Sequence, residues 1–210
     1  MIPVKVLAVR YLANASPALL KGLGAPAGYR SLGMLTTDCD DATYIALDAA
    51  TKAADVEVVY GRSFYAGAAN ATTPNAGEVI GILAGATPGA VKSGMEAALE
   101  MLNRVGFADL GGVPCLTQTV SSVGTFLAKE AGVRVGSAVA YLIAPPLESM
   151  YAMDAAMKAA DVKLCKLYAP PSETNFGGGL LTGTQSACQA ACAAFAAAVA
   201  EVAANPKEGK

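Results

Sequence analysis

The stretch Asp48-Ala-Ala-Thr-Lys52-Ala-Ala-Asp55-Val-Glu-Val-Val59 returns 106 positions later as Asp154-Ala-Ala-Met-Lys158-Ala-Ala-Asp161-Val-Lys-Leu-Cys165. Each copy predicts the last turns of an Ala-rich helix that runs into an apolar strand. A second match, at a spacing of 108, relates Lys21–Gly24 to Lys129–Gly132. The chain is therefore predicted to contain a duplicated unit of about a hundred residues.

The duplication predicts two domains, residues 1–109 and residues 110–210, each within the usual size range of a domain. Helical and strand patterns alternate in both halves, and the last two strands of each half are joined by a long hairpin loop. This pattern favours an α+β fold in which an antiparallel sheet is flanked by helices.

The expected elements follow the same order in both halves. The first half should contain strands at 4–11, 30–37, 56–62 and 78–83, with helices that start at Ser16-Pro17, near Ala42 and at Thr87-Pro88. The second half should contain strands at 115–120, 137–144, 162–168 and near Leu180, with helices at 122–131, 148–160 and 184–203.

The composition points to extensive burial of surface. Only 15% of the 210 residues are charged and 54% are hydrophobic, and the mean hydropathy is +0.42. Such a chain must bury apolar surface within the monomer or between subunits, so we expect it to assemble. The longest apolar run, Ala190–Ala200, is too short to cross about 30 Å of hydrocarbon. With no secretory signal after Met1, no membrane partner and a cytoplasmic location are expected.

Several kinds of chemistry are excluded or disfavoured. The chain contains no His, which removes Ser-His-Asp and Cys-His catalysis and the common zinc ligand sets. Its five cysteines indicate reduced thiols rather than a disulfide framework. Cys188 and Cys192 could supply half a metal site, although packing as small buried residues is favoured. A net charge of −2 disfavours nucleic-acid binding. No persuasive catalytic set is visible, so we expect no enzyme activity, cofactor or metal.

Two motifs allow more than one interpretation. The stretch Gly85-Ala-Thr-Pro-Gly-Ala-Val-Lys-Ser93 is similar to a phosphate-binding loop, but Val91 stands where that loop needs Gly, and Thr87-Pro88 better explains it as a helix start. Asp38, Asp40 and Asp41 could hold a hard cation or could cap the following helix.

The two hairpin loops, Ser63–Gly77 and Ala169–Gly178, are longer than most connections in compact domains, and loops of this kind tend to be functional. They lie at equivalent places in the two copies. We therefore expect both to point toward one shared location.

The repeated pattern Asp-Ala-Ala-x-Lys-Ala-Ala-x-Val and the Ser31-Leu-Gly-Met-Leu35 strand resemble the bacterial microcompartment (BMC) shell domain. A strand and a helix precede Ser31, and another such pair lies at Cys115–Ala131, so the order is similar to that of a circularly permuted, tandem BMC protein. Four further stretches resemble shell proteins of the ethanolamine-utilisation type: Val58–Gly67, Ala144–Glu148, Pro170–Phe176 and Leu181–Cys188.

This resemblance implies a structural protein of the microcompartment shell, in the cytoplasm. Three chains would form a homotrimeric, pseudohexameric tile that assembles with other shell proteins. The long loops would meet at the threefold axis as a gated pore through which small metabolites or cofactors pass. The residues expected at this pore are Arg62, Ser63, Tyr65, Asn70, Glu173, Thr174, Asn175 and Phe176.

The resemblance also implies two smaller sites. Lys52 and Lys158 take the position of an edge lysine that meets the neighbouring tile. Asp40, Glu78 and the backbone carbonyl of Phe107 match positions that hold ethanolamine. Carboxylates suit this ligand because an alkylammonium and a hydroxyl together offer four hydrogen-bond donors.

An alternative from another class of function stays open. A free small-molecule sensor or enzyme could also be built on duplicated α+β domains. The shell interpretation, unlike this one, predicts two-dimensional sheets and no turnover.

Overall fold

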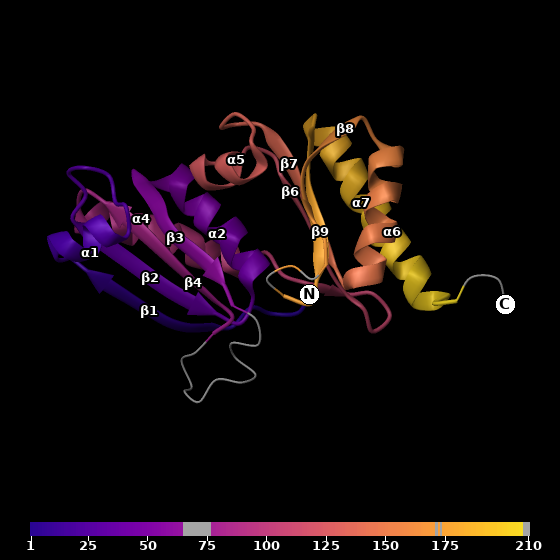
Figure 1. The fold of residues 1–210 in the computed structure, drawn as a ribbon, viewed down its shortest axis with the longest axis horizontal. Coiled ribbons are helices and arrows are strands. Elements are labelled where there is room, and N and C mark those ends of the chain that lie inside the picture. Colours follow the sequence, from indigo (N-terminus) through magenta and orange to yellow (C-terminus); the bar gives the residue numbers. More distant parts are fainter. Residues whose placement is uncertain (65–76, 171, 173, 208–210) are drawn as a thin grey trace. The chain divides into compact units, whose positions relative to one another are not determined.

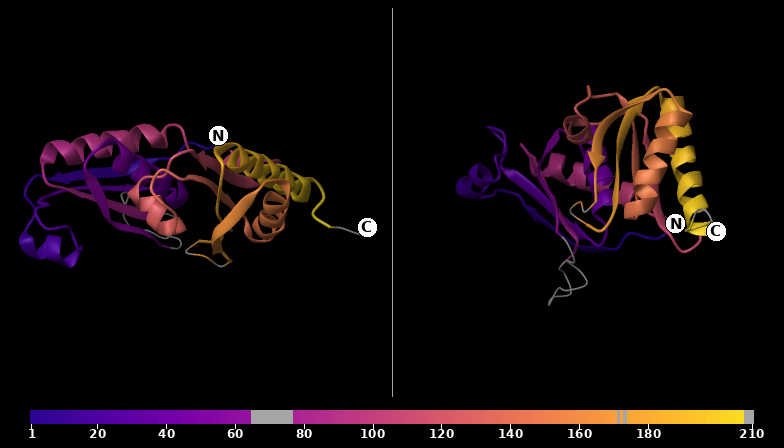
Figure 2. Two further views of the ribbon diagram at one scale, coloured as in Figure 1. Left: turned by 90° about the horizontal axis from the view of Figure 1, so that it is seen from above. Right: turned by 45° about the vertical axis from the view of Figure 1, so that its right-hand side comes forward.

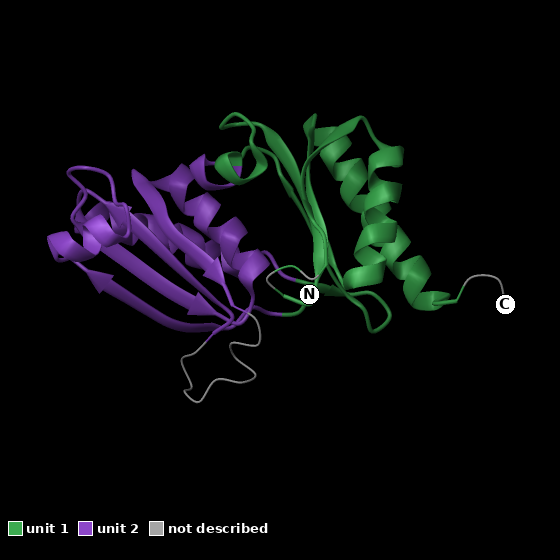
Figure 3. Ribbon diagram, viewed as in Figure 1, with its two compact units in different colours: residues 1–2, 107–123, 128–210 green, residues 3–106, 124–127 purple. Residues whose placement is uncertain are grey.

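The computed structural model of the chain describes residues 1–64, 77–170, 172 and 174–207 (Figure 1). These residues form two compact units (Figure 3). Residues 3–106 and 124–127, purple and keyed as unit 2 in Figure 3, make up what we call the first unit. Residues 1–2, 107–123 and 128–210, green and keyed as unit 1, make up the second unit. The predicted domain boundary between residues 109 and 110 follows the sequence repeat, whereas these two units are defined by contacts within the fold. The boundary therefore stays a prediction.

The first unit contains a four-stranded antiparallel sheet in the order β1-β2-β4-β3. Helices α2 and α4 pack on this sheet and on each other, as predicted for an α+β fold. The short helix α1 connects β1 to β2. The bounds of these elements are β1 Val6–Leu12, α1 Pro17–Gly22, β2 Ser31–Thr37, α2 Asp40–Ala53, β3 Val56–Ser63, β4 Val79–Gly85 and α4 Pro88–Leu102.

The second unit repeats this arrangement with one additional short strand, giving the order β5-β6-β7-β9-β8. Helices α6 and α7 pack side by side on one face of its sheet (Figure 2). The bounds are β5 Ala108–Asp109, β6 Pro114–Val120, α5 Thr125–Ala131, β7 Ala138–Ala144, α6 Pro146–Ala159, β8 Val162–Tyr168, β9 Gly177–Gly183 and α7 Gln185–Ala204. The first three residues of α5 belong to the first unit.

The duplication extends to local irregularities of the backbone. The outer strands β3 and β8 each change register at one point, between Val58 and Tyr60 and between Leu164 and Lys166. These two irregularities are 106 positions apart, the spacing of the sequence repeat. The turns after α1 and α5 also correspond, since Gly24 and Gly132 have φ of 68° and 64°. The two halves therefore share backbone geometry as well as sequence.

The helix starts were predicted unevenly. Ser16 and Thr87 are N-caps, as expected, and each side chain accepts a hydrogen bond from the backbone N–H three residues later. The capping role given to the acidic run Asp38–Asp41 was wrong, and Asp40 and Asp41 lie within the first turn of α2. Cys39 is the N-cap of that helix and makes no side-chain cap, while the Asp38 carboxylate accepts from Lys5 N instead.

Helix α7 is the longest helix described and contributes to the core of the second unit. Its inner face includes Cys188 and Phe195, both fully buried against the sheet and α6. No membrane-spanning helix was expected, because the longest uninterrupted apolar run, Ala190–Ala200, is short. By length and composition α7, at 20 residues, could cross a bilayer. Because one side of α7 packs into the core, these two properties are only a weak indication.

Candidate functional site

The predicted ligand carboxylates of Asp40 and Glu78 both belong to the first unit. Asp40 opens α2 and is 8% exposed, and its Oδ1 accepts a hydrogen bond from Asp41 N at 2.8 Å. Glu78 directly precedes β4, where its backbone N–H donates to Thr37 O at 2.8 Å and its carbonyl accepts from Phe64 N at 3.0 Å. The pairing of β2 with β4 therefore places the start of α2 beside the end of the first long loop.

The ionisation of Glu78 reflects its burial and its acidic surroundings. Burial raises the pKa of the Glu78 carboxyl, and the negative charges of Asp40 and Asp38 raise it further. Negative charges held close to a carboxyl disfavour its ionised form, here that of Glu78. A bound cation would relieve this repulsion, so the chemistry of the site suits an ammonium group.

Phe107, the third residue predicted for the ligand site, belongs to the second unit. Its carbonyl accepts a hydrogen bond from Ile2 N at 2.6 Å. Its ring contacts that of Phe176, with centroids 5.2 Å apart and an interplanar angle of 44°. Phe176, predicted to line the pore, therefore packs on Phe107. A shared ligand site of Phe107 with Asp40 and Glu78 stays a prediction.

The predicted pore residues that the structure describes lie at the ends of the two long loops. Arg62 and Ser63 end β3, and the Ser63 hydroxyl oxygen is buried. Thr174 and Asn175 precede β9 in a segment closed by Ser172, whose hydroxyl donates to Phe176 O at 2.9 Å. Tyr65, Asn70 and Glu173 lie outside the described residues. The pore role of the five described residues stays a prediction.

The two predicted edge lysines occupy equivalent positions with unequal surroundings. Lys52 lies 3.2 Å from Asp48 and its side chain is 33% exposed. Lys158 lies 2.6 Å from Asp154 and its side chain is 75% exposed. Both lysines thus pair with the acidic residue one turn earlier, and both reach solvent.

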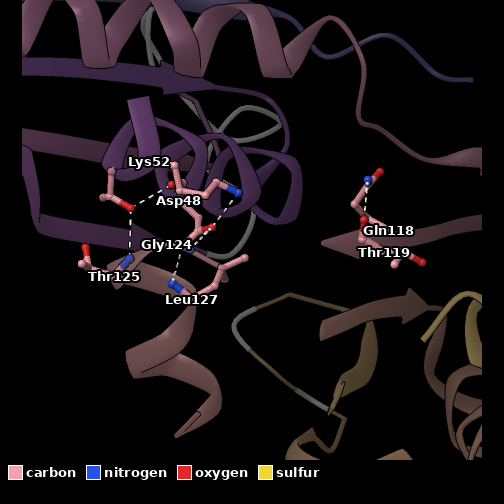
Figure 4. A network of polar contacts seen from close by, with 8 residues as sticks. Asp48, Lys52, Gln118, Thr119, Gly124, Thr125 and Leu127 are labelled. Carbon is pink, nitrogen blue, oxygen red and sulfur yellow. Dashed lines mark hydrogen bonds and ion pairs between the residues drawn. The ribbon is translucent and has the colours of Figure 1, made fainter. Parts of the chain in front are cut away.

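A buried carboxylate that the sequence did not single out as a site organises the first unit. Asp48 is fully buried, and its two oxygens accept hydrogen bonds from Gly124 N and Leu127 N, each at 2.8 Å (Figure 4). Thr51 Oγ1 accepts from Thr125 N at 3.1 Å. Residues 124–127 are thereby held on α2. The sequence marked Asp48 only as part of a repeat, because its partners lie 76 and 79 positions away.

The close approach at Asp48 depends on Gly124. A Cβ at this position would lie 2.2 Å from Thr51 Oγ1 and 2.8 Å from Asp48 O. Only Gly fits without movement of its neighbours, since real Cβ atoms do not come so close to backbone oxygen atoms. The sequence held one sign of this contact: the second repeat has Gly124 where the first repeat has Ser16.

The cysteines behave as packing residues. Cys188 is buried in the core of the second unit, and Cys192, which packs against that core, accepts a hydrogen bond from Thr119 Oγ1 at 3.4 Å. Burial raises the pKa of the Cys115 thiol to about 12. Within the described ranges, no group of three or more His, Cys, Asp or Glu side chains is arranged to hold a metal ion.

Comparison with known proteins agrees with this architecture. A family model described as the BMC domain matches residues 31–109. The chain is 56% identical over 210 residues to the bacterial microcompartment shell protein EutL of Clostridium perfringens, covering 98% of this chain and 97% of that protein. It is 47% identical to the EutL protein of Salmonella typhimurium, covering 98% of this chain and 96% of that protein.

The structural comparison gives the same result. The crystal structure of the ethanolamine utilization protein EutL from Leptotrichia buccalis superimposes with a TM-score of 0.95 at 56% identity, covering 98% of this chain and 96% of that chain. Two BMC-like units in one chain, matched end to end by these relatives, lead to one conclusion. The chain belongs to the EutL family of bacterial microcompartment shell proteins.

Proposed function

We propose that this chain is a tile of a bacterial microcompartment shell in ethanolamine utilisation, assembled as a homotrimer with other shell proteins and without catalytic activity of its own. The observation that carries the proposal is the tandem pair of BMC-like units, matched over almost the whole chain by shell proteins at 56% identity. Three copies of a two-unit chain supply six similar units, and head-to-tail contacts between them can close into a ring. The low content of charged residues supports such burial between subunits.

We further propose that the two long loops surround a central pore in this tile. The first loop joins β3 to β4 and the second joins β8 to β9, which are equivalent pairs of strands in the two units. Loops rich in Gly, Ala, Asn, Ser and Thr permit alternative backbone states and offer polar groups without strong binding, as permeation requires.

A small-amine site at Asp40 and Glu78 fits the same function. The two carboxylates lie at the root of the first long loop, where Phe64 N donates to Glu78 O. A bound ammonium would neutralise part of the repulsion that raises the pKa of Glu78. The ligand can shift the loop only by its difference in affinity for the two loop states.

Calorimetry tests the small-amine site. Ethanolamine should bind with a dissociation constant on the order of millimolar to tens of micromolar, since two charge-assisted hydrogen bonds must offset immobilisation of the ligand. Asp40→Asn and Glu78→Gln should each weaken binding about tenfold or more. Glu57→Gln, which changes an exposed carboxylate on β3, serves as the matched control. Unchanged affinity in both site variants would remove these carboxylates from any ligand role.

The same titration at several pH values adds a second criterion. Because the pKa of Glu78 is raised, this carboxyl takes up its proton at a higher pH than a free Glu, and protonation removes its charge. Affinity for ethanolamine should therefore be full near neutral pH. It should fall as the pH is lowered through the raised pKa of Glu78, and the Glu78→Gln variant should lose this part of the pH dependence.

Electron microscopy of concentrated protein tests the tile and its edge lysines. Wild-type protein should form flat sheets, and a Lys52→Ala/Lys158→Ala double variant should form trimers but few or no sheets. A single surface pair contributes at most about 1 kcal/mol, but a lattice repeats each contact along every edge. The lysines are replaced by Ala rather than Asp, because a negative charge at position 52 would lie beside the buried carboxylate of Asp48. Lys92→Ala, at an exposed ion pair on α4, is the matched control. Sheets that persist unchanged in the double variant would rule out these lysines as edge contacts.

A further inference from the structure

Thr37, the last residue of β2, is bonded toward both carboxylates of the proposed small-amine site. Its carbonyl oxygen accepts a hydrogen bond from Glu78 N at 2.8 Å. Its Oγ1 lies 3.0 Å from Cys39 O, and Cys39 directly precedes Asp40. Thr37 therefore contacts one ligand residue through its backbone and the neighbour of the other through its side chain.

The Thr37 hydroxyl belongs to a fully buried pair. Thr37 and Thr43 are both 0% exposed, and their Oγ1 atoms lie 2.7 Å apart. Cys39 N donates to Thr37 Oγ1 at 3.1 Å, and Thr43 Oγ1 donates to Cys39 O at 2.7 Å. When the Thr37 hydroxyl donates to Thr43 Oγ1, both hydroxyl protons have acceptors. The pair then bonds the N–H and the C=O of Cys39 together.

The start of α2 depends on this pair because the helix has no side-chain cap of its own. Cys39 occupies the N-cap position and makes no side-chain cap hydrogen bond. Ser, Thr, Asp and Asn are preferred there because their side-chain oxygen accepts from a free backbone N–H. Here two hydroxyls instead fix the backbone of Cys39, and with it the place where Asp40 begins the helix.

The chain at Glu78 is held equally closely to the end of β2. A Cβ built at Gly77 would lie 2.2 Å from Thr37 O and 2.3 Å from Thr36 Oγ1. Gly at position 77 therefore lets the chain approach Thr37 closely enough for Glu78 N to bond to it. Thr37 thus fixes the chain on both sides of the proposed site.

We propose that Thr37 is a positioning residue of the small-amine site. Its buried hydroxyl, with that of Thr43, holds the start of α2, and its carbonyl holds Glu78. The two ligand carboxylates are thereby kept at one separation, against the repulsion between their charges. Acceptors that are already in place lose less freedom when the ligand binds. This role rests on the small-amine site proposed above.

Calorimetry with ethanolamine on the full-length protein tests this role. Thr37→Val keeps the β-branched shape and removes the hydroxyl, so it should raise the Kd for ethanolamine about fivefold or more. Thr43→Val is the milder second variant, because Thr43 N still donates to Cys39 O, and it should also weaken binding. Thr37→Ser keeps the hydroxyl and should bind within about twofold of the wild type.

Ser31→Ala is the matched control. Ser31 lies at the other end of β2, is 1% exposed, and its hydroxyl donates to Ala13 O at 2.8 Å. This variant also loses a buried hydroxyl on β2, so it should lower stability but leave the Kd unchanged. Equal weakening of binding in Ser31→Ala and Thr37→Val would trace the effect to stability alone and overturn the proposal.

The pKa of the Glu78 carboxyl, followed by NMR, gives a second readout. This pKa is raised by burial and by the charges of Asp40 and Asp38. Thr37→Val releases the carboxylates from their fixed separation, so the pKa of Glu78 should fall toward its ordinary value. Thr37→Ser and Ser31→Ala should leave it raised.

The two readouts separate failure of the positioning role from failure of the small-amine site. If wild-type protein binds ethanolamine and both valine variants bind it equally well, the positioning role is overturned and the site stands. If wild-type protein binds no ethanolamine, the site is wrong, and the pKa of Glu78 decides the role of Thr37. A lower pKa in Thr37→Val then supports the holding of the carboxylates by Thr37, and an unchanged pKa overturns it.

Discussion

Replacing Asp48 with Ala is expected to lower the free energy of unfolding by roughly 2–5 kcal/mol, because two buried backbone donors lose their acceptor at roughly 1–3 kcal/mol each. The substitution leaves the backbone amides of Gly124 and Leu127 buried without their acceptor and removes the partner of Lys52. Unsatisfied buried donors cost their full desolvation penalty, so the loss exceeds that of the hydrogen bonds alone. Chemical denaturation at a fixed protein concentration measures the change.

Two further variants make this test specific. Asp48→Asn keeps one acceptor oxygen and should lose less than Asp48→Ala. Glu100→Ala removes one partner of an exposed i,i+4 ion pair with Arg104 and should change stability by less than about 1 kcal/mol. If Asp48→Ala proved no more destabilising than Glu100→Ala, Asp48 would not organise the first unit.

Replacing Gly178 with Ala should destabilise the second unit by roughly 3 kcal/mol or more, and poor soluble expression would agree with this expectation. Gly178 has φ of 142°, a conformation that L side chains rarely adopt. A Cβ there would lie 1.9 Å from Leu142 O on the neighbouring strand β7, so the pairing of β7 with β9 must open. Loss of this pairing would disturb the strand that follows the second long loop.

Gly22→Ala is the matched control for this substitution. Gly22 lies in α1, and a Cβ built there meets no atom within 4 Å. Ala is also the better helix former, so this variant should be neutral or slightly stabilising. Thermal unfolding followed by circular dichroism compares the two. Similar melting temperatures for Gly178→Ala and Gly22→Ala would show that the close approach at Leu142 is not required.

The elements that sequence alone predicted well are those whose signals are local. Ser16-Pro17 and Thr87-Pro88 each place a capping side chain directly before a helix, and both helices begin there. The repeat of Asp48–Val59 at Asp154–Cys165 predicted a helix followed by a strand in both halves, and α2-β3 and α6-β8 confirm it.

The predictions that failed or fell short concern contacts between distant parts of the chain. The acidic run Asp38–Asp41 was expected to cap α2, but the Asp38 carboxylate instead accepts a hydrogen bond from Lys5 N, 33 positions away. The two-residue strand β5 was missed because so short a segment has no periodic pattern.

The difference between the two copies could not be predicted either. Asp48 and Asp154 stand in nearly identical local sequences, so local reasoning treats them alike. Only the fold shows that residues 124–127 cover the first and leave the second exposed. The candidate ligand carboxylates Asp40 and Glu78 were named from a resemblance, and the structure adds that they lie close enough for their charges to interact.

The central claim, that this chain is a trimeric tile of a shell, is tested most directly by electron microscopy of the concentrated, unmodified protein. We expect flat sheets whose averaged repeating particle has threefold symmetry and the mass of three 21.0 kDa chains. Separate particles of one or two chains, with no sheets at any concentration, would contradict it.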